Sequence, residues 1–139
     1  MPDLADKFEA SKLESTLLVL FIPSVDRNQK AIDQDLWVRT ALEVLGTHFG
    51  GATAFPQGLG VWRDDAQGGK LIYDEPVIIQ CYTNEKTLEE RASELRQFLV
   101  RMGTDTNQGA VGFVIDRDYL EIRFPYKEPA DGQEHPEAR

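Results

Sequence analysis

Hydrophobic positions along the chain follow two different spacings, and each spacing predicts a different element. Residues 16–22, with the sequence TLLVLFI, are apolar on both alternating faces, which is typical of an interior strand covered on both sides. Between residues 33 and 49 the apolar positions instead recur every three or four residues. This spacing predicts an amphipathic helix that is capped by Asp33 and ends at Gly50.

The middle of the chain predicts a hairpin followed by a second helix. Residues 52–65 contain proline and glycine at positions that do not fit an interior strand, and they predict a bent edge strand. Residues 70–82 are extended again, and the glycine-containing turn between the two stretches joins them as a hairpin. Residues 87–102 return to helical spacing, and Thr87 with Glu90 predicts a capping box at the start of this helix.

Two last strands are predicted where apolar residues alternate, at 111–115 and 120–124. The predicted element order is β-α-β-β-α-β-β. Because crossover connections are right-handed, we expect the sheet order 2-3-1-4-5 with both helices on one face. This α+β arrangement resembles the ferredoxin-like superfold over residues 15–125. The resemblance is one of architecture, and such a superfold hosts enzymes, regulators and binding domains alike.

The opposite face of such a sheet needs a cover, since its alternating strands would otherwise expose aromatic and aliphatic side chains to water. The first predicted strand is apolar on both of its faces. We therefore expect a homodimer packed face to face. The alternative is that the N-terminal segment or the long hairpin of the same chain folds over this face.

Length and composition favour a single domain. The chain has 139 residues, of which 41% are hydrophobic and 28% are charged, as in ordinary globular proteins. The longest apolar run is too short to cross a bilayer, and the first residues lack the apolar core of a secretory signal, so we expect a cytoplasmic protein without membrane association. We expect residues 1–14 to be a flexible segment, 15–125 to be one α+β domain, and 126–139 to be a disordered acidic tail.

Charge and cysteine content exclude some kinds of function. The 24 acidic and 15 basic side chains give a net charge of −9, which repels nucleic-acid phosphates and argues against nucleic acid as a partner. The single cysteine, Cys81, excludes an internal disulfide and a cysteine-rich zinc site. A buried Cys81 is expected to act as a small hydrophobic residue, since nothing in the sequence marks a base that would activate it.

Four carboxylates lie close together in the sequence around the predicted hairpin. These residues are Asp64, Asp65, Asp74 and Glu75. Converging carboxylates can hold Mg²⁺ or Mn²⁺, and a metal so held can activate water against a phosphoester. The simpler interpretation is that Arg63 neutralises its neighbours on an exposed turn, because adjacent strand residues point to opposite faces.

Other polar residues are candidates for binding a ligand or partner. Trp62 beside Arg63 is the kind of exposed pair that anchors interfaces. His48, near the end of the first helix, is either a general base or a helix-terminal residue with a half-buried ring. The set of ligand- or partner-binding candidates is Trp62, Arg63, Glu75, Gln80, Tyr82, Gln108 and His48.

Two functions from different classes fit these features. We prefer a non-catalytic binding or regulatory module, acting as a homodimer, that engages a protein or a small ligand through the hairpin and the acidic surface. The alternative is a metal-dependent hydrolase that uses the carboxylates of the 62–75 hairpin. No catalytic residue and no cofactor is assigned from the sequence.

Overall fold

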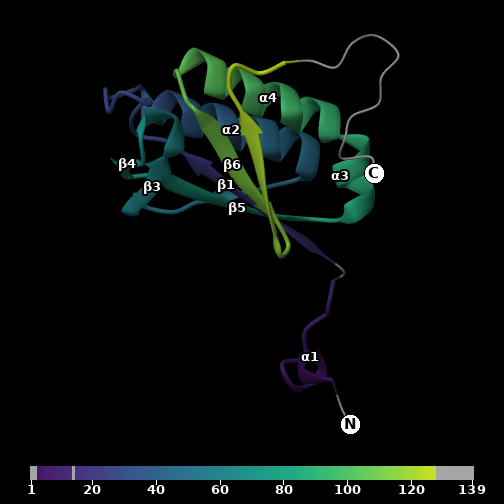
Figure 1. The fold of residues 1–139 in the computed structure, drawn as a ribbon. Coiled ribbons are helices and arrows are strands. Elements are labelled where there is room, and N and C mark those ends of the chain that lie inside the picture. Colours follow the sequence, from purple (N-terminus) through teal and green to yellow (C-terminus); the bar gives the residue numbers. More distant parts are fainter. Residues whose placement is uncertain (1–2, 14, 128–139) are drawn as a thin grey trace.

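The computed structural model describes residues 3–13 and 15–127, which form a mixed α+β fold (Figure 1). The predicted α+β class is confirmed. Five strands form one sheet in the order β2-β5-β1-β6-β7 with antiparallel pairings, and β3 pairs with β4 in a separate hairpin. The elements are α1 (Leu4–Lys7), β1 (Thr16–Ile22), α2 (Gln34–Phe49), β2 (Thr53–Ala54), β3 (Gly60–Asp64), the 3₁₀ turn η1 (Asp65–Gln67), β4 (Lys70–Asp74), β5 (Val77–Thr83), α3 (Glu85–Glu90), α4 (Ala92–Asp105), β6 (Ala110–Ile115) and β7 (Asp118–Arg123).

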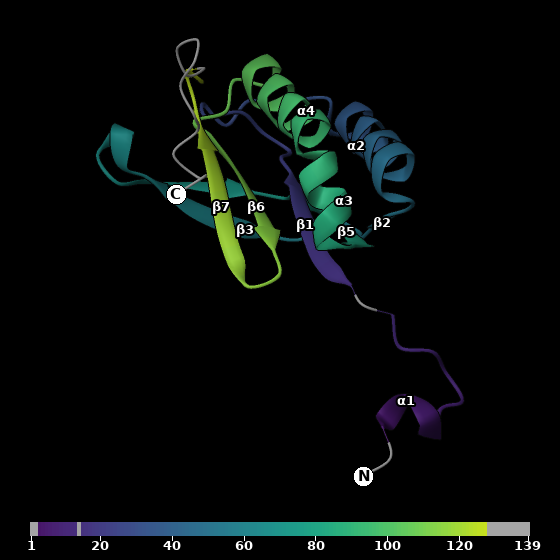
Figure 2. The same ribbon diagram turned by 90° about the vertical axis from the view of Figure 1, so that its right-hand side faces the viewer.

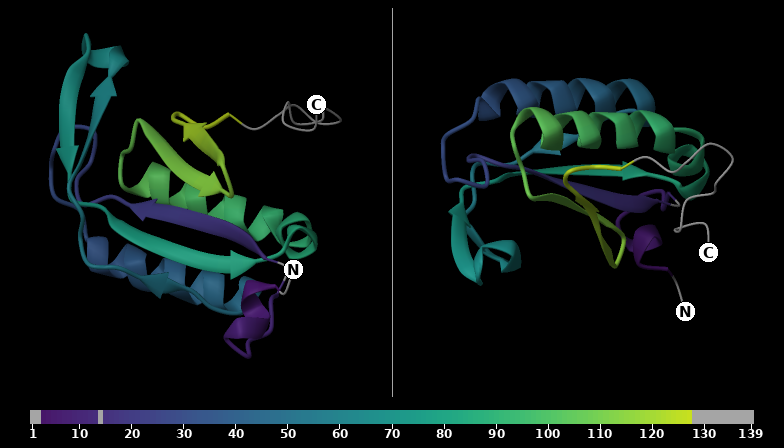
Figure 3. Two further views of the ribbon diagram at one scale, coloured as in Figure 1. Left: turned by 90° about the horizontal axis from the view of Figure 1, so that it is seen from below. Right: turned by 45° about the horizontal axis from the view of Figure 1, so that its top comes forward.

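The central strand β1 separates the core from an open face. Leu18, Leu20 and Ile22 alternate along β1, are fully buried, and belong to the core cluster beneath the helices. Helices α2 and α4 lie side by side on that face of the sheet (Figure 2). Val19 and Phe21 alternate with these buried residues along β1 and point to the opposite face of the sheet. None of the described helices covers that face (Figure 3, left).

The first predicted helix forms as expected. The side chain of Asp33 accepts a hydrogen bond from the backbone N–H of Leu36, which satisfies one of the free donors at the start of α2. At the other end Gly50 adopts a left-handed conformation with φ 95°, which glycine tolerates without strain. The buried positions of α2 are Trp37, Ala41, Leu45 and Phe49.

The segments follow one another across the main sheet as 53–54, 77–83, 16–22, 110–115 and 118–123. Both predicted middle strands are nevertheless divided in the structure. The first leaves the sheet after β2 and re-forms as β3, and the second is interrupted at Glu75 and Pro76 between β4 and β5. The described residues therefore form seven strands, and this differs from the predicted β-α-β-β-α-β-β pattern. The extra hairpin β3–β4 stands at the end of the sheet where Ile22 pairs with Val77 (Figure 3, left).

The second predicted helix is also divided. It consists of α3 and α4, which are separated at Arg91. The helix is capped by Asn84, whose side chain accepts a hydrogen bond from the backbone N–H of Thr87 at 2.9 Å. The prediction of a capping box that starts at Thr87 is therefore wrong, because Asn84 provides the cap three residues earlier.

The two ends of the chain lie outside the sheet and helix layers or outside the described residues. The short helix α1 stands away from the sheet, beyond the start of β1 (Figure 1). From residue 128 onward the predicted acidic tail lies outside the described residues. Among the residues that the structure describes, no helix has the length and apolar character required to cross a membrane.

Candidate functional site

A cavity of about 170 Å³ opens on the helix-free face, where the hairpin β3–β4 approaches β6 and β7. Its wall combines aromatic rings with carboxylates, and the sequence separates these groups by up to 100 residues. Strand alternation and register bring them together, because positions two residues apart share a face. The lining residues are Phe21, Pro23, Trp62, Asp74, Gln108, Ala110, Val111, Gly112, Tyr119 and Glu121.

One wall of this cavity depends on a glycine in β6. The ring of Tyr119 lies across Gly112, so that a β-carbon at position 112 would overlap the ring and its hydroxyl group. Gly112 pairs with Glu121, whereas Tyr119 pairs with Val114, so the ring reaches Gly112 diagonally across the strands. Gly112 thus leaves the space in which the Tyr119 ring forms part of the wall.

The protonation of Tyr119 is affected by its surroundings. Burial raises the pKa of the Tyr119 phenol, and the negative charge of Glu121 raises this pKa further. Both effects disfavour the phenolate. At neutral pH the hydroxyl group is therefore a neutral donor beside a carboxylate.

The carboxylate of Asp74 is held in place by the loop that follows β1. The backbone N–H and the hydroxyl group of Ser24 both donate to Oδ1 of Asp74, at 2.8 and 2.5 Å. The Ser24 oxygen in turn accepts a hydrogen bond from the backbone N–H of Glu75 at 2.9 Å. Among the described residues Oδ2 of Asp74 has no hydrogen-bond donor, so this oxygen can accept a hydrogen bond from a ligand in the cavity.

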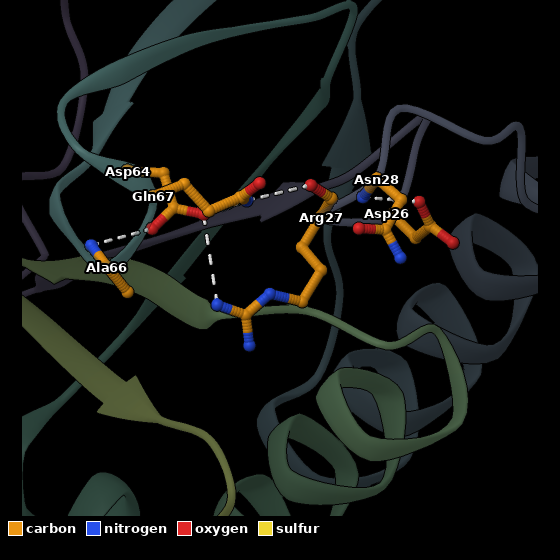
Figure 4. Close-up of polar contacts among 6 residues, drawn as sticks. All are labelled: Asp26, Arg27, Asn28, Asp64, Ala66 and Gln67. Atoms are coloured by element: carbon orange, nitrogen blue, oxygen red, sulfur yellow. Dashed lines mark hydrogen bonds and ion pairs between the residues drawn. The ribbon is translucent and has the colours of Figure 1, made fainter.

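The hairpin is fastened to the body of the protein through Asp64 (Figure 4). This side chain is only 4% exposed, and it accepts hydrogen bonds from the backbone N–H of Ala66 and from the side-chain amide of Gln67. The guanidinium group of Arg27 lies 3.8 Å from Oδ2 of Asp64. Asp26 in turn orders the loop, because its Oδ1 accepts hydrogen bonds from two backbone N–H groups, those of Asn28 at 2.7 Å and of residue 30 at 2.9 Å.

This fastening positions the indole of Trp62 over the turn before β6. A β-carbon built at Gly109 would lie 3.5 Å from Nη2 of Arg27 and 3.6 Å from Cη2 of Trp62. Both side chains therefore pack against the backbone of this turn. The contact places Trp62 at the cavity, while its strand neighbours Val61 and Arg63 point outward and are exposed.

Three of the residues singled out from the sequence line the cavity: Trp62, Asp74 and Gln108. Gln108 also has an internal role, because its amide nitrogen donates to the backbone oxygen of Val25 at 2.9 Å and to the carbonyl and hydroxyl oxygens of Thr106. Gln108 is thus a buried residue that connects two loops by hydrogen bonds. Its side-chain amide N–H groups donate to oxygens of the protein itself.

The other candidates lie elsewhere. Arg63 forms an exposed ion pair with Asp65. Gln80 and Tyr82 share the open face, but they pair with Val19 and Leu17 and lie toward the far end of β1 from the cavity.

His48 and Glu75 also lie apart from the cavity lining. His48 is on α2, which packs on the opposite face of the sheet. Glu75 is exposed at the end of β4, and only its backbone N–H takes part in the Ser24 contact.

The four hairpin carboxylates do not converge. Asp64 is bound within the hairpin, Asp65 pairs with Arg63, and Asp74 accepts hydrogen bonds from Ser24. Within the described ranges no group of three or more histidine, cysteine, aspartate or glutamate side chains is arranged to hold a metal ion.

Sequence reasoning missed Phe21, Tyr119 and Glu121 as site residues. The signal was present in the last strand, where Tyr119 and Glu121 alternate with the apolar Leu120 and Ile122. A glycine inside the preceding strand also indicates a close approach by another group. Neither feature says which distant loop completes the site.

No protein-family model and no curated protein matches this sequence. Solved structures do match its fold. The chain is similar to a phage SAM lyase in complex with S-methyl-5′-thioadenosine, with a TM-score of 0.63 and 16% sequence identity, over 85% of this chain and 98% of that one. It is also similar to a phage SAM lyase in the apo state, with a TM-score of 0.52 and 17% identity, over 85% of this chain and 100% of that one.

At this level of identity the similarity establishes a shared fold. It nevertheless overturns the preferred interpretation from the sequence. A non-catalytic binding or regulatory module was the wrong choice, because the neighbours that share this fold over nearly their whole length are enzymes. The hydrolase alternative lacks its metal site among the described residues, because the hairpin carboxylates do not converge.

Proposed function

We propose that this chain is a lyase that cleaves S-adenosylmethionine (SAM), or a closely related sulfonium nucleoside, in the cavity on its helix-free face. One observation carries the proposal: on a fold shared with a SAM lyase, three aromatic rings and two carboxylates line one cavity. These groups are Phe21, Trp62, Tyr119, Asp74 and Glu121.

The chemistry of the wall suits a cationic nucleoside. SAM carries a positive sulfonium sulfur, an ammonium group and a planar adenine. Aromatic faces attract cations and stack on flat rings, so Trp62 and Tyr119 fit both the sulfonium and the adenine. Oε1 of Glu121 already accepts a hydrogen bond from Nε of Arg123 at 2.9 Å, which leaves its Oε2 atom. This atom and Oδ2 of Asp74 can accept hydrogen bonds from the ammonium group or the ribose hydroxyl groups.

The proposed reaction breaks the bond between the sulfonium sulfur and the γ-carbon of the aminobutyrate group. The electron pair of this bond goes to sulfur and leaves the neutral thioether S-methyl-5′-thioadenosine. Two routes are possible from here. In the first, the carboxylate of the substrate itself attacks the γ-carbon and closes a lactone, and no protein group has to transfer a proton. In the second, the neighbouring carbon loses a proton and an alkene forms. The second route requires a base, and Glu121 or Asp74 would serve as that base.

A partly dry site favours either route. The positive charge of the sulfonium is lost as the bond breaks, and water stabilises the charged reactant more than the neutral product. Apolar walls that exclude water therefore favour the loss of this charge. Phe21, Pro23 and Ala110 supply such a wall.

The cavity is smaller than a site that encloses a whole nucleoside. Its volume of about 170 Å³ falls below the range of roughly 300–1,000 Å³ that is typical of small-molecule sites. Part of the substrate would extend over the open face. A homodimer that covers this face, in the cytoplasm, remains part of our proposal, and a monomeric mass by light scattering at micromolar concentration would contradict the dimer.

The proposal is tested by incubating the purified chain with SAM and measuring S-methyl-5′-thioadenosine by liquid chromatography. We expect release well above the uncatalysed rate, and a loss of about tenfold or more in Trp62→Ala and Glu121→Gln. Matched controls are Tyr73→Ala, on the exposed outer side of the same hairpin, and Glu43→Gln, on α2. A folded wild-type chain that releases no more thioether than buffer alone would refute the proposal. The second product, lactone or alkene, distinguishes the two routes.

A further inference from the structure

A second depression lies on the other side of the sheet, between the helices and the edge strand β7. It is an apolar groove of about 470 Å³. Helices α2 and α4 pack over β5, β1 and β6, and the helix layer ends before β7 (Figure 2). The groove thus lies at the edge of the helix layer, beside β6 and β7. Its apolar lining includes Leu88, Leu95, Leu99, Phe113, Leu120 and Ile122.

The N-terminal arm, residues 3–13, carries apolar side chains that would fit such a groove. Leu4, Phe8 and Leu13 are 67%, 74% and 79% exposed. Leu4 and Phe8 are four residues apart around the single turn of α1, so they lie on the same side of it. The arm projects from the start of β1 and away from the sheet (Figures 1 and 2). Exposed apolar side chains that share one side of a segment form a patch, and such patches mark contact surfaces.

We propose that the arm of one copy of this protein docks in the apolar groove of a second copy. Leu4 and Phe8 would replace water over the uncovered part of the sheet. Charge supports the match. Of the two arginines at the groove, Arg123 is paired with Glu121, which leaves Arg96 as the unpaired positive charge of the described lining. The arm has a net negative charge, with three acidic residues (Asp3, Asp6 and Glu9) against two lysines (Lys7 and Lys12). Arg96 has no carboxylate within ion-pairing distance among the residues that the structure describes.

Two other occupants from this chain fit less well. The C-terminal segment 128–139 follows Tyr126 at the groove, but its only aliphatic residues are two alanines, which cannot fill an apolar site of this size. The arm of the same chain would have to reverse its direction before β1. The connecting residues 9–15, EASKLES, contain neither glycine nor proline, the residues that most readily form such a turn. A second copy receives the arm without this reversal.

Cysteine cross-linking of full-length chains tests the proposal. One chain carries Phe8→Cys and the other carries Leu120→Cys, and the two are mixed and oxidised. The native Cys81 is buried and does not compete. We expect a disulfide-linked mixed dimer. The matched control replaces Leu120→Cys by Leu59→Cys, an exposed leucine beside the hairpin, and should give several-fold less mixed dimer.

The remaining outcomes overturn the proposal. If a chain with both Phe8→Cys and Leu120→Cys closes a disulfide within itself while the mixed pair does not cross-link, the arm occupies its own groove. If neither arrangement cross-links above the Leu59→Cys control, the arm does not dock in the groove. A variant gives an independent check that does not depend on the homodimer at the helix-free face: Leu4→Asp in the Phe8→Cys chain should lower the yield of mixed dimer several-fold, and an unchanged yield would contradict docking.

Discussion

The ring of Tyr119 on β7 occupies the space above Gly112 on β6 that any β-carbon at this position would fill. The two residues face the same side of the sheet as Phe21 and Glu121. Because Gly112 has no side chain, the Tyr119 ring can form one wall of the proposed active site. It also makes the wall sensitive to a single methyl group.

We predict that Gly112→Ala impairs activity more than stability. The Tyr119 ring is 63% exposed and can swing outward, so the change in unfolding free energy should stay within about 1 kcal/mol. The displaced ring no longer faces the substrate, and the release of S-methyl-5′-thioadenosine should fall about tenfold. Thermal melting and product release measure the two effects.

A glycine outside the site provides the control for this experiment. Gly46 lies within α2, and a β-carbon there would meet no atom within 4 Å. Gly46→Ala should raise the unfolding free energy by about 0.5–1 kcal/mol and leave activity unchanged. Equal losses of activity in the two variants would show that the ring position over Gly112 does not matter.

The phenol of Tyr119 should titrate above the usual range for tyrosine. Burial is the larger cause of its raised pKa and Glu121 is the smaller one, so Glu121→Gln should lower this pKa only in part. Because the folded state holds this proton more tightly than the unfolded state, the resulting stabilisation is present below a pH of about 10 and is lost as the pH rises further.

Ultraviolet titration of wild type against Tyr119→Phe isolates this group from the other tyrosines. A difference spectrum that titrates at or below the usual tyrosine range would contradict the environment described here. If Glu121→Gln leaves the midpoint unchanged, the charge of Glu121 does not reach the phenol.

Much of the fold follows from local patterns in the sequence. The apolar run at 16–22 and the capped helix after Asp33 are specified by neighbouring residues alone, and both form as expected. The departures occur where tertiary contacts decide. Gln57 donates a hydrogen bond to Gln34, and Gln34 donates to the backbone of Ile22 and of Glu75, which secures the chain as it leaves and re-enters the sheet. These partners lie far apart in sequence, and no periodicity reveals them.

The site was harder to predict for the same reason. Trp62 and Asp74 were identified as candidates from residue type, yet the partners expected for them were their neighbours in the hairpin. The structure instead brings them to Tyr119 and Glu121, about 45 to 60 residues further on. The register of β6 with β7 and the loop tie through Gln108 produce this convergence, and both depend on the complete fold.

Two neighbouring aspartates of the hairpin should differ in their effect on stability. Asp64→Ala leaves the amide of Gln67 and the half-buried Arg27 without their carboxylate, and should cost about 1–3 kcal/mol. Asp65→Ala removes only an exposed pair with Arg63 and should cost less than about 1 kcal/mol. Urea unfolding measures both. Because Asp64 fastens the hairpin that carries Trp62, its variant should also lose SAM cleavage, and equal stabilities of the two variants would contradict this role.

The start of α3 offers a second test of a single side chain. Asn84→Ala removes the acceptor for the backbone N–H of Thr87 and should lower the unfolding free energy by about 1 kcal/mol. Thr87→Ala keeps this cap and places a better helix former in the first turn, so it should be neutral within about 0.5 kcal/mol. The reverse order in urea unfolding would show that Thr87 begins the helix after all. Since α3 supplies Leu88 to the apolar groove, a frayed α3 in Asn84→Ala should also weaken self-association, while Thr87→Ala should not.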